Sequence, residues 1–353
     1  MIKRRAMMRI KRIRALVSIA ALAVFLFFIP ISCIGCSTVF GFSSWESPKT
    51  LSLVSYNTQT FFDAIEDGQE FNGFKGSKSR WSPERYKVRL NRLREALMIA
   101  TEALTGDINS LPDILILQEI EGERVINDFC RQLSRKENYN YAVITPIEKN
   151  AAFTTALLSK LPILDVFIHR LHTEKESVRP LCEVWINIGS EEYPEPLVVF
   201  STHWKSKLGK NTAEIRRMQE KQVFQKIQEL KKTNPDIHYV ICGDFNQPLE
   251  EFDLLTELPN SWNRCEYLRA LSVNAQPGGS FCYKGNWQAI DHIFYSENLS
   301  DNKGLDIEHF AVIAIPPLIT SARKPNAYSV FSGKGYSDHL PIGVRLKKYN
   351  SEE

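Results

Sequence analysis

Three features are scarce in this sequence, and each scarcity excludes a class of protein. None of the five cysteines that follow residue 36 shows metal-ligand spacing, and the chain has no internal repeat or low-complexity segment. Basic residues are not in excess outside the N-terminus, because seven of the 44 precede residue 15 and the remaining 37 face 41 acidic ones. The body therefore has no strong electrostatic signature for nucleic acid, which still leaves room for a nuclease that holds phosphate through a metal and a few cations.

The first 36 residues are interpreted as a targeting segment rather than part of the fold. A basic stretch ends at Arg14, an apolar run covers residues 15–31, and Gly35-Cys36 follows shortly after. This ending resembles the lipobox of bacterial lipoproteins, although Cys33 stands where that motif usually has Leu. The resemblance implies that Cys36 is lipidated and that residues 37–49 form a tether. The alternative is an uncleaved transmembrane anchor, since the run is about long enough to span a bilayer. Both interpretations predict an exported, membrane-anchored protein outside the cytoplasm, periplasmic or on the cell surface.

Five cysteines remain after the targeting segment. Cys182 and Cys242 lie in strand-like runs and are expected to be buried apolar residues. Cys265 and Cys282 flank a loop-rich stretch, so a disulfide between them is a candidate in an exported protein.

Apolar periodicity predicts an α/β domain over residues 50–350. Pro83 suits the first turn of a helix, and apolar residues then recur at helical spacing up to Ala100. Further helices are expected at residues 122–133 and 213–232. Strands are expected at residues 50–56, 112–118, 141–145, 154–159, 183–188, 197–201, 239–242, 288–295 and 343–347. Residues 64–82 are predicted to form a loop, and residues 311–335 an irregular excursion near the site.

Five short polar clusters follow strand-like apolar runs, and they carry the functional signal. They are Ser55-Tyr56-Asn57, Gln118-Glu119, Thr202-His203-Trp204, Gly243-Asp244-Phe245-Asn246 and Ser337-Asp338-His339-Leu340-Pro341. Together they supply the carboxylates, amides and imidazoles that metal-dependent hydrolysis of phosphoric esters requires.

Each cluster also has a simpler interpretation. Glu119 alone could be a solvated carboxylate at a strand end. Asp244 and Asn246 lie two residues apart, on one face if the segment is extended, but both types also favour an Asx turn. His339 could be an ordinary surface residue. Its useful arrangement is with a carboxylate on one ring nitrogen, and Asp291, from a separate strand, is the better candidate for that role.

In this order the clusters resemble the endonuclease/exonuclease/phosphatase superfamily, which includes pancreatic deoxyribonuclease, abasic-site endonucleases, bacterial sphingomyelinases and inositol-polyphosphate phosphatases. The resemblance covers nearly all of residues 51–347. It implies a four-layer fold, in which a sandwich of two mixed sheets is flanked by helices, with the active site at one end of the sheets.

The resemblance also implies roles for individual residues. Glu119 matches the principal Mg²⁺ ligand, with Asn57 and Asp338 beside the metal. Asp244 matches the water-binding carboxylate, and Asp291 the one that orients the catalytic His339. Three residues match phosphate-binding positions: Asn246, His203 and, on a thinner motif, Arg179. His203 also stands where the deoxyribonuclease and sphingomyelinase branches carry His and the abasic-site enzymes carry Tyr.

The function expected from this resemblance is hydrolysis of phosphodiester bonds in nucleic acid, with Mg²⁺ as the cofactor and Mn²⁺ as an alternative, by a monomer. Hydrolysis of a phospholipid head group or an inositol phosphate is the alternative enzyme activity, for which Trp262 or residues 328–331 could contact a membrane. A catalytically inactive binding lipoprotein on the same fold is the second alternative.

Overall fold

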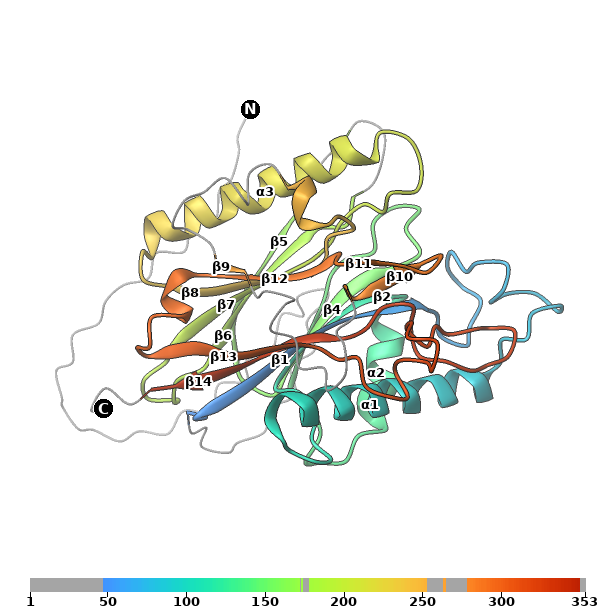
Figure 1. Ribbon diagram of the computed structural model, residues 1–353, viewed down its shortest axis with the longest axis horizontal. Helices are drawn as coiled ribbons and strands as arrows, with labels where there is room; N and C mark the ends of the chain where they lie inside the picture. The colour runs from blue at the N-terminus through green and yellow to red at the C-terminus, as the bar shows by residue number, and fades with distance from the viewer. Residues whose placement is uncertain (1–46, 172, 174–177, 253–262, 265–277, 350–353) are drawn as a thin grey trace, which may run out of the picture. The chain divides into compact units, whose positions relative to one another are not determined.

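A computed structural model describes residues 47–171, 173, 178–252, 263–264 and 278–349. These residues form two six-stranded sheets and a separate two-stranded hairpin, with helices on the outer sides of the sheets (Figure 1). Both sheets are mixed, since each contains one parallel pair of strands at its centre.

The first sheet has the strand order β13-β14-β1-β2-β4-β3. Its strands are β1 (Thr50–Phe61), β2 (Ile114–Ile120), β3 (Tyr141–Ile144), β4 (Thr154–Ser159), β13 (Leu305–Val312) and β14 (Ile342–Lys348). Strands β1 and β2 run parallel, and the run Ile114–Leu117 of β2 is fully buried. A central strand covered on both faces has this continuous apolar pattern.

The second sheet has the order β5-β6-β7-β8-β12-β9. Its strands are β5 (Ile163–His169), β6 (Leu181–Asn187), β7 (Pro196–His203), β8 (His238–Asp244), β9 (Asn263–Arg264) and β12 (Asp291–Tyr295). Strands β7 and β8 are parallel, and β12 pairs antiparallel with β8.

The sheets pack face to face around a common apolar core. Leu53 and Ile116 of the first sheet belong to the same buried cluster as Val199 and Val240 of the second. At about 25 cal/mol per Å² of buried apolar area, this interface is a main source of stability.

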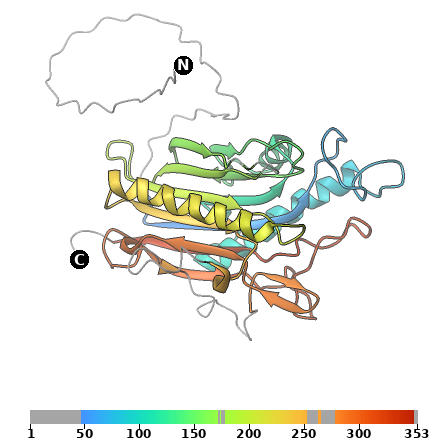
Figure 2. The same cartoon turned by 90° about the horizontal axis from the view of Figure 1, so that it is seen from above.

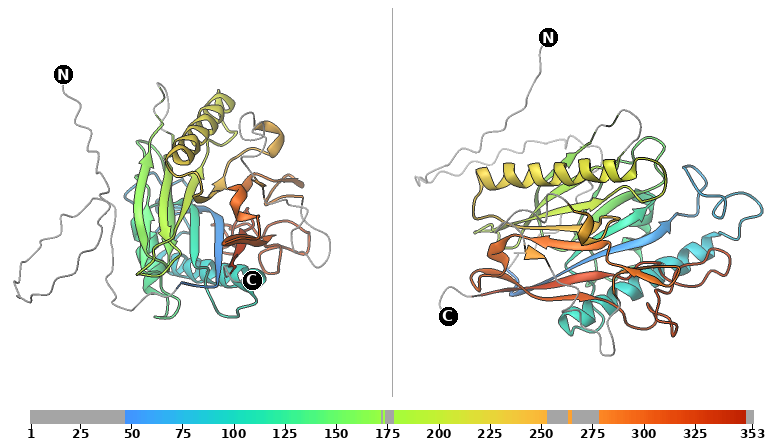
Figure 3. Two further views of the ribbon diagram at one scale, coloured as in Figure 1. Left: turned by 90° about the vertical axis from the view of Figure 1, so that its left-hand side faces the viewer. Right: turned by 45° about the horizontal axis from the view of Figure 1, so that its top comes forward.

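Two long helices complete the layers. Helix α1 (Pro83–Thr105) packs on the first sheet, with α2 (Glu123–Arg131) beside it. Helix α3 (Thr212–Thr233) packs Val223 and Ile227 onto the second sheet. Figures 2 and 3 show α3 and α1 on opposite sides of the stacked strands. The predicted four-layer sandwich of mixed sheets is confirmed.

The structure corrects some element boundaries. Strand β1 extends through Asn57 to Phe61, and β5 and β13 were not predicted. The single strand predicted at 288–295 is two: β11 (Asn286–Gln288) forms a hairpin with β10 (Phe281–Tyr283), and β12 begins at Asp291. Residues 313–335 are irregular, as expected, apart from isolated bridges.

The predicted targeting segment and tether lie almost wholly outside the described residues, so both stay predictions. No helix among the residues that the structure describes is long and apolar enough to cross a bilayer. Cys182 and Cys242 are buried, as expected. Cys282 has a free thiol in the structure, and its suggested partner Cys265 lies outside the described residues, so their disulfide is untested.

Candidate active site

Strand register brings the predicted residues to one end of both sheets. Asn57 pairs with Gln118 across the parallel strands β1 and β2, which places Asn57 beside Glu119. On the other sheet, His203 at the end of β7 pairs with Asp244 at the end of β8, and Asp244 pairs with Asp291 at the start of β12. Because parallel strands end on the same edge, their last residues gather where ligands bind in α/β proteins.

The backbone at these strand ends is unusual. Glu119 has φ of 60° and lies at a shift of register between β2 and β4. Gly243 has φ of +147°, and a Cβ there would lie 1.9 Å from the carbonyl oxygen of Thr202. Positive φ in non-glycine residues is costly and persists where the surroundings enforce it, often at functional sites.

His339 and Asp291 form a buried dyad. The Nδ1 of His339 lies 2.7 Å from Oδ2 of Asp291, and the hydroxyl of Ser280 donates to the same oxygen at 2.5 Å. The ring of Phe281 packs against the imidazole, with centroids 4.7 Å apart. Burial lowers the pKa of His339, but Asp291, Asp244 and Asp338 outweigh burial and raise it to about 10. His339 is therefore a cation at neutral pH in the metal-free protein.

Asp244 lies between two imidazoles. Its Oδ2 accepts a hydrogen bond from Nδ2 of Asn57 at 2.9 Å and lies 3.6 Å from Nε2 of His203 and 3.9 Å from Nε2 of His339. The last two separations exceed hydrogen-bond distance, so neither imidazole is hydrogen-bonded to the carboxylate. Burial raises the pKa of Asp244 to about 7, and Asp291 adds to the rise.

The predicted phosphate-binding residues meet near the carbonyl oxygen of Trp204. Nδ2 of Asn246 donates to that oxygen at 3.1 Å, and Nη1 of Arg179 at 3.5 Å. Burial lowers the pKa of His203 well below its ordinary value, with Arg179 and His339 adding to the effect, so His203 is neutral.

Glu119, Asn57 and Asp338 provide oxygen donors suited to a hard cation. Oε2 of Glu119 accepts from the backbone N–H of Thr60 at 2.6 Å, while the one hydrogen bond of Oε1 among the described residues is a 3.4 Å contact with Nδ2 of Asn57. Burial raises the pKa of Asp338, with His339 opposing and Glu119 adding to the rise. A cation here would relieve the repulsion between these two carboxylates.

Asp244, Asp291 and His339 are also a candidate metal site, since each offers one ligand atom within 4.8 Å of the others. However, Oδ2 of Asp291 is already bound by His339 and Ser280. Imidazole is moreover a poor ligand for Mg²⁺. The donor set around Glu119 is therefore the better match for a hard ion.

Some expectations need correction. Asn246 has φ of 52° and its backbone N–H donates to Oδ1 of Asp244 at 2.8 Å, so the segment is an Asx turn rather than extended. His339 is buried, with 6% of its surface exposed, so it is not an ordinary surface residue. Tyr328 is buried too, which removes it from any membrane contact, and Trp262 lies outside the described residues.

Two residues with a positioning role were missed. Ser280 follows two glycines and carries no signal in a single sequence. Arg89 falls on the apolar face of α1, one position before Leu90. A charged residue on an apolar helix face is unusual, so the sequence could have pointed to it.

Comparison with known proteins agrees with this geometry. The model of the Endonuclease/Exonuclease/phosphatase family matches residues 52–348, and the chain belongs to that family. It is accordingly a metal-dependent hydrolase of phosphoric esters. No curated protein matches the sequence significantly.

Several solved structures share the fold. Truncated Caenorhabditis elegans TDP2 has 16% identity and a TM-score of 0.53, over 84% of this chain and 98% of that one. The human Nocturnin catalytic domain with bound sulfate has 17% identity and a TM-score of 0.53, over 89% and 98%. A Bacteroides thetaiotaomicron mannosyl-6-phosphatase has 16% identity and a TM-score of 0.51, over 84% and 99%. At these identities the likeness concerns the fold alone.

Proposed function

We propose that this protein is a Mg²⁺-dependent phosphodiesterase whose leading substrate is nucleic acid. The observation that carries the proposal is the buried Asp244, bound by Asn57 and faced by two imidazoles of opposite protonation state. Such an arrangement provides a proton acceptor and proton donors within one small space.

The charge states divide the catalytic roles. Asp244, with its pKa raised to about 7, binds the attacking water and accepts its proton. His339, held as a cation by Asp291, stabilises the charge that develops on the phosphoryl oxygens. Asn246, Arg179 and the neutral His203 hold the remaining phosphate oxygens.

Glu119, Asn57 and Asp338 would hold the ion, and Mg²⁺ there would neutralise negative charge as the phosphorus–oxygen bond breaks. Mn²⁺ has similar ligand preferences and is the alternative. The hydrogen bond from the Thr60 backbone fixes Oε2 of Glu119 and so orients the carboxylate.

Two other ester classes remain as outcomes of the test. A phospholipid or inositol-phosphate ester would use the same residues, and the sugar phosphatase among the structural relatives makes a phosphomonoester worth including. All the polar residues of the site are present, so the inactive binding-protein alternative has no support from this chain.

The first test is hydrolysis of plasmid DNA, RNA, sphingomyelin, an inositol phosphate and mannose 6-phosphate, each with Mg²⁺ and again after EDTA treatment. Nicked plasmid or degraded RNA is expected, with activity lost in EDTA and restored by Mg²⁺. His339→Ala should lower the rate by about 10²–10³-fold while circular dichroism stays unchanged, because removing one group that stabilises the developing charge costs that much.

His309→Ala, which removes a half-buried imidazole on β13, is the matched control and should keep wild-type activity. Near-normal hydrolysis by His339→Ala would refute the catalytic assignment. Release of phosphocholine or of phosphate alone would move the substrate to lipids or to monoesters.

We further propose that the enzyme works outside the cytoplasm on a lipid anchor at Cys36. The basic and apolar N-terminal segment and the Gly35-Cys36 pair support this. Such a location favours extracellular nucleic acid over chromosomal DNA as the substrate.

A further inference from the structure

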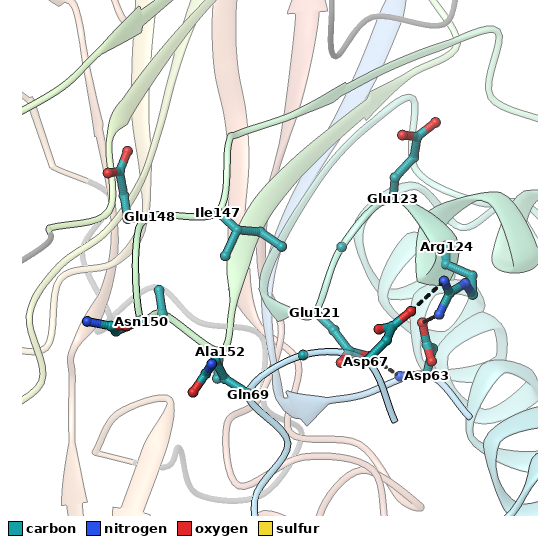
Figure 4. Close-up of a pocket in the computed structure, with 13 residues that line it drawn as sticks. Asp63, Asp67, Gln69, Glu121, Glu123, Arg124, Ile147, Glu148, Asn150 and Ala152 are labelled. Carbon is teal, nitrogen blue, oxygen red and sulfur yellow. Dashed lines mark hydrogen bonds and ion pairs between the residues drawn. The ribbon is translucent and has the colours of Figure 1, made fainter. Parts of the chain in front are cut away.

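We propose a second metal site, formed by Asp67, Glu70 and Glu121, that binds Ca²⁺ and has a structural role. It shares no residue with the cluster around Asp244 and Glu119. The site lies beside a pocket of about 340 Å³ at the exit of β1 and the end of β2 (Figure 4).

The three carboxylates converge although they come from two segments of the chain. One oxygen from each of Asp67, Glu70 and Glu121 lies within 4.8 Å of the others. The segment from β1 is folded tightly here, since the backbone N–H groups of Asp67 and Gly68 both donate to Oε1 of Glu70, at 2.8 and 2.7 Å. Figure 4 shows the side chain of Glu121 next to that of Asp67.

Glu121 provides the independent indication of a ligand. Its side chain is only 8% exposed, and its buried Oε1 accepts from no N–H or hydroxyl group among the described residues, so its side-chain partner there is the carboxyl group of Glu70. The other oxygen, Oε2, accepts from the backbone N–H of Asp63 at 2.6 Å, which aims Oε1 into the cluster. A buried carboxylate oxygen that faces other carboxylates needs either a shared proton or a cation.

The local charge favours a cation. Five of the residues that line the pocket are acidic, and Arg124 is the one cationic side chain among its lining residues. That guanidinium forms ion pairs with Asp63 at 2.7 Å and with Asp67 at 2.8 Å. No ion pair involving Glu70 or Glu121 occurs in the part of the chain that the structure describes.

The ligand set suits Ca²⁺ better than Mg²⁺, because Ca²⁺ accepts about six to eight oxygens in flexible geometry. Two oxygens on opposite sides of Ca²⁺, at about 2.3–2.6 Å each, are roughly 4.6–5.2 Å apart, so three oxygens within 4.8 Å of one another can share one ion. Mg²⁺ would draw the oxygens to about 4.2 Å at most and requires near-octahedral geometry. Water and the oxygens of Gln69 or Asn150, which also line the pocket, could complete the irregular coordination that Ca²⁺ accepts.

A cation here would fasten the loop after β1 to the end of β2. The loop already packs Phe74 against Phe62 and Phe153, but the ion pairs of its acidic end within the described residues are with Arg124 alone. Because β2 also carries Glu119, the ion would fix the strand end that presents the catalytic carboxylate.

The test is Ca²⁺ binding to the full chain in detergent, stripped of metal and carrying Glu119→Gln so that the catalytic site contributes little. Calorimetric titration with Ca²⁺ should give one site, with a Kd of about 10⁻⁴–10⁻³ M or tighter, as in extracellular calcium modules. Glu121→Gln and Glu70→Gln, each added separately, should weaken binding by roughly tenfold or more. Glu123→Gln, at an exposed acidic position of the same pocket, is the matched control and should leave binding unchanged.

Unchanged Ca²⁺ affinity in both Glu121→Gln and Glu70→Gln would overturn the proposal, as would the absence of saturable binding up to about 5 mM, well above this range. Binding of Mg²⁺ in preference to Ca²⁺ at these residues would overturn the choice of ion. Loss of binding in either variant that still unfolds cooperatively supports the site. None of these readouts uses hydrolysis, so the result is independent of the proposed catalytic function.

Discussion

At the scale of single residues, burial and neighbouring charge give the two catalytic imidazoles opposite states. Both are almost fully buried, which alone would make both neutral. Asp291 lies 2.7 Å from His339, whereas His203 has a cationic Arg179 and His339 in its surroundings. The same residue type therefore serves as a cation in one position and as a neutral hydrogen-bonding group in the other.

Asp291→Asn should lower the pKa of His339 from about 10, because burial remains while the main opposing carboxylate is gone. The imidazole resonances of the metal-free protein, followed by NMR titration, measure this shift directly. Hydrolysis should fall by about 10²-fold or more, since His339 loses both its charge and its orientation. An unchanged titration of His339 would contradict the positioning role of Asp291.

The raised pKa of His339 predicts that the stability of the protein depends on pH, and that Asp291→Asn weakens this dependence. His339 titrates at a higher pH in the folded than in the unfolded protein, so its stabilisation is complete below pH 6.5 and is lost as pH rises to about 10. The free energy of unfolding of the metal-free protein should decline across that window, and the decline should be shallower in Asp291→Asn. Urea unfolding at several pH values tests both statements.

Motifs at strand ends predicted which residues gather, but not how they do so. Asp244 and His339 could be predicted from the sequence, because each belongs to a short polar cluster after an apolar run. The φ of 60° at Glu119 and the hydrogen bond from Ser280 to Asp291 were not, since both depend on contacts between distant segments. Asn246 shows the limit of local pattern, because an Asx turn and an extended phosphate-binding pair require the same residue types.

At the scale of elements, helix α1 fixes the end of β1 through Arg89. This side chain is 2% exposed and donates to the carbonyl oxygens of Thr58 and Thr60 at 2.9 Å each, and also to that of Gln59. Its guanidinium stacks on the rings of Phe61 and Tyr328. The irregular end of β1, from which Thr60 binds Glu119, is thereby held in place.

Arg89→Met should lower the free energy of unfolding by about 3 kcal/mol, because one buried and two partly buried carbonyl groups lose their donor. Lys87→Met, at an exposed position of the same helix, should change it by less than about 0.5 kcal/mol. Chemical denaturation compares the two variants. Equal stability of Arg89→Met and Lys87→Met would show that the guanidinium does not support the strand end.

Elements with one clear period were predictable and edge strands were not. The face of α1 that begins at Tyr86 and the buried run of β2 each have a simple pattern. In contrast, β5 is half-exposed along its length, and β13 mixes Asp, Glu and His with apolar residues. Such strands are recognised by their partners rather than by their own sequence.

At the scale of the whole molecule, we propose that the N-terminal segment decides where the domain works. In a bacterial host, Cys36→Ser should abolish labelling with a radioactive fatty acid and leave an unprocessed, longer chain, because the acceptor thiol is gone. Cys33→Ser is the matched control and should be labelled normally. Persistent labelling of Cys36→Ser would contradict lipidation at that residue, and an unlabelled wild-type chain that stays in the membrane would indicate the uncleaved anchor.

Because the site is divided between two sheets, the rate of hydrolysis is a sensitive measure of how the sheets are stacked. Asn57 belongs to one sheet and Asp244 to the other, and 2.9 Å separates their bonded atoms. A slide of one sheet by about 1 Å would leave every strand ladder intact yet misalign the reacting groups, a displacement that can cost about 10²-fold in rate. On heating, hydrolysis should therefore fade at a lower temperature than the far-ultraviolet circular dichroism signal, and coincident losses would show that the sheets separate only when the whole domain unfolds.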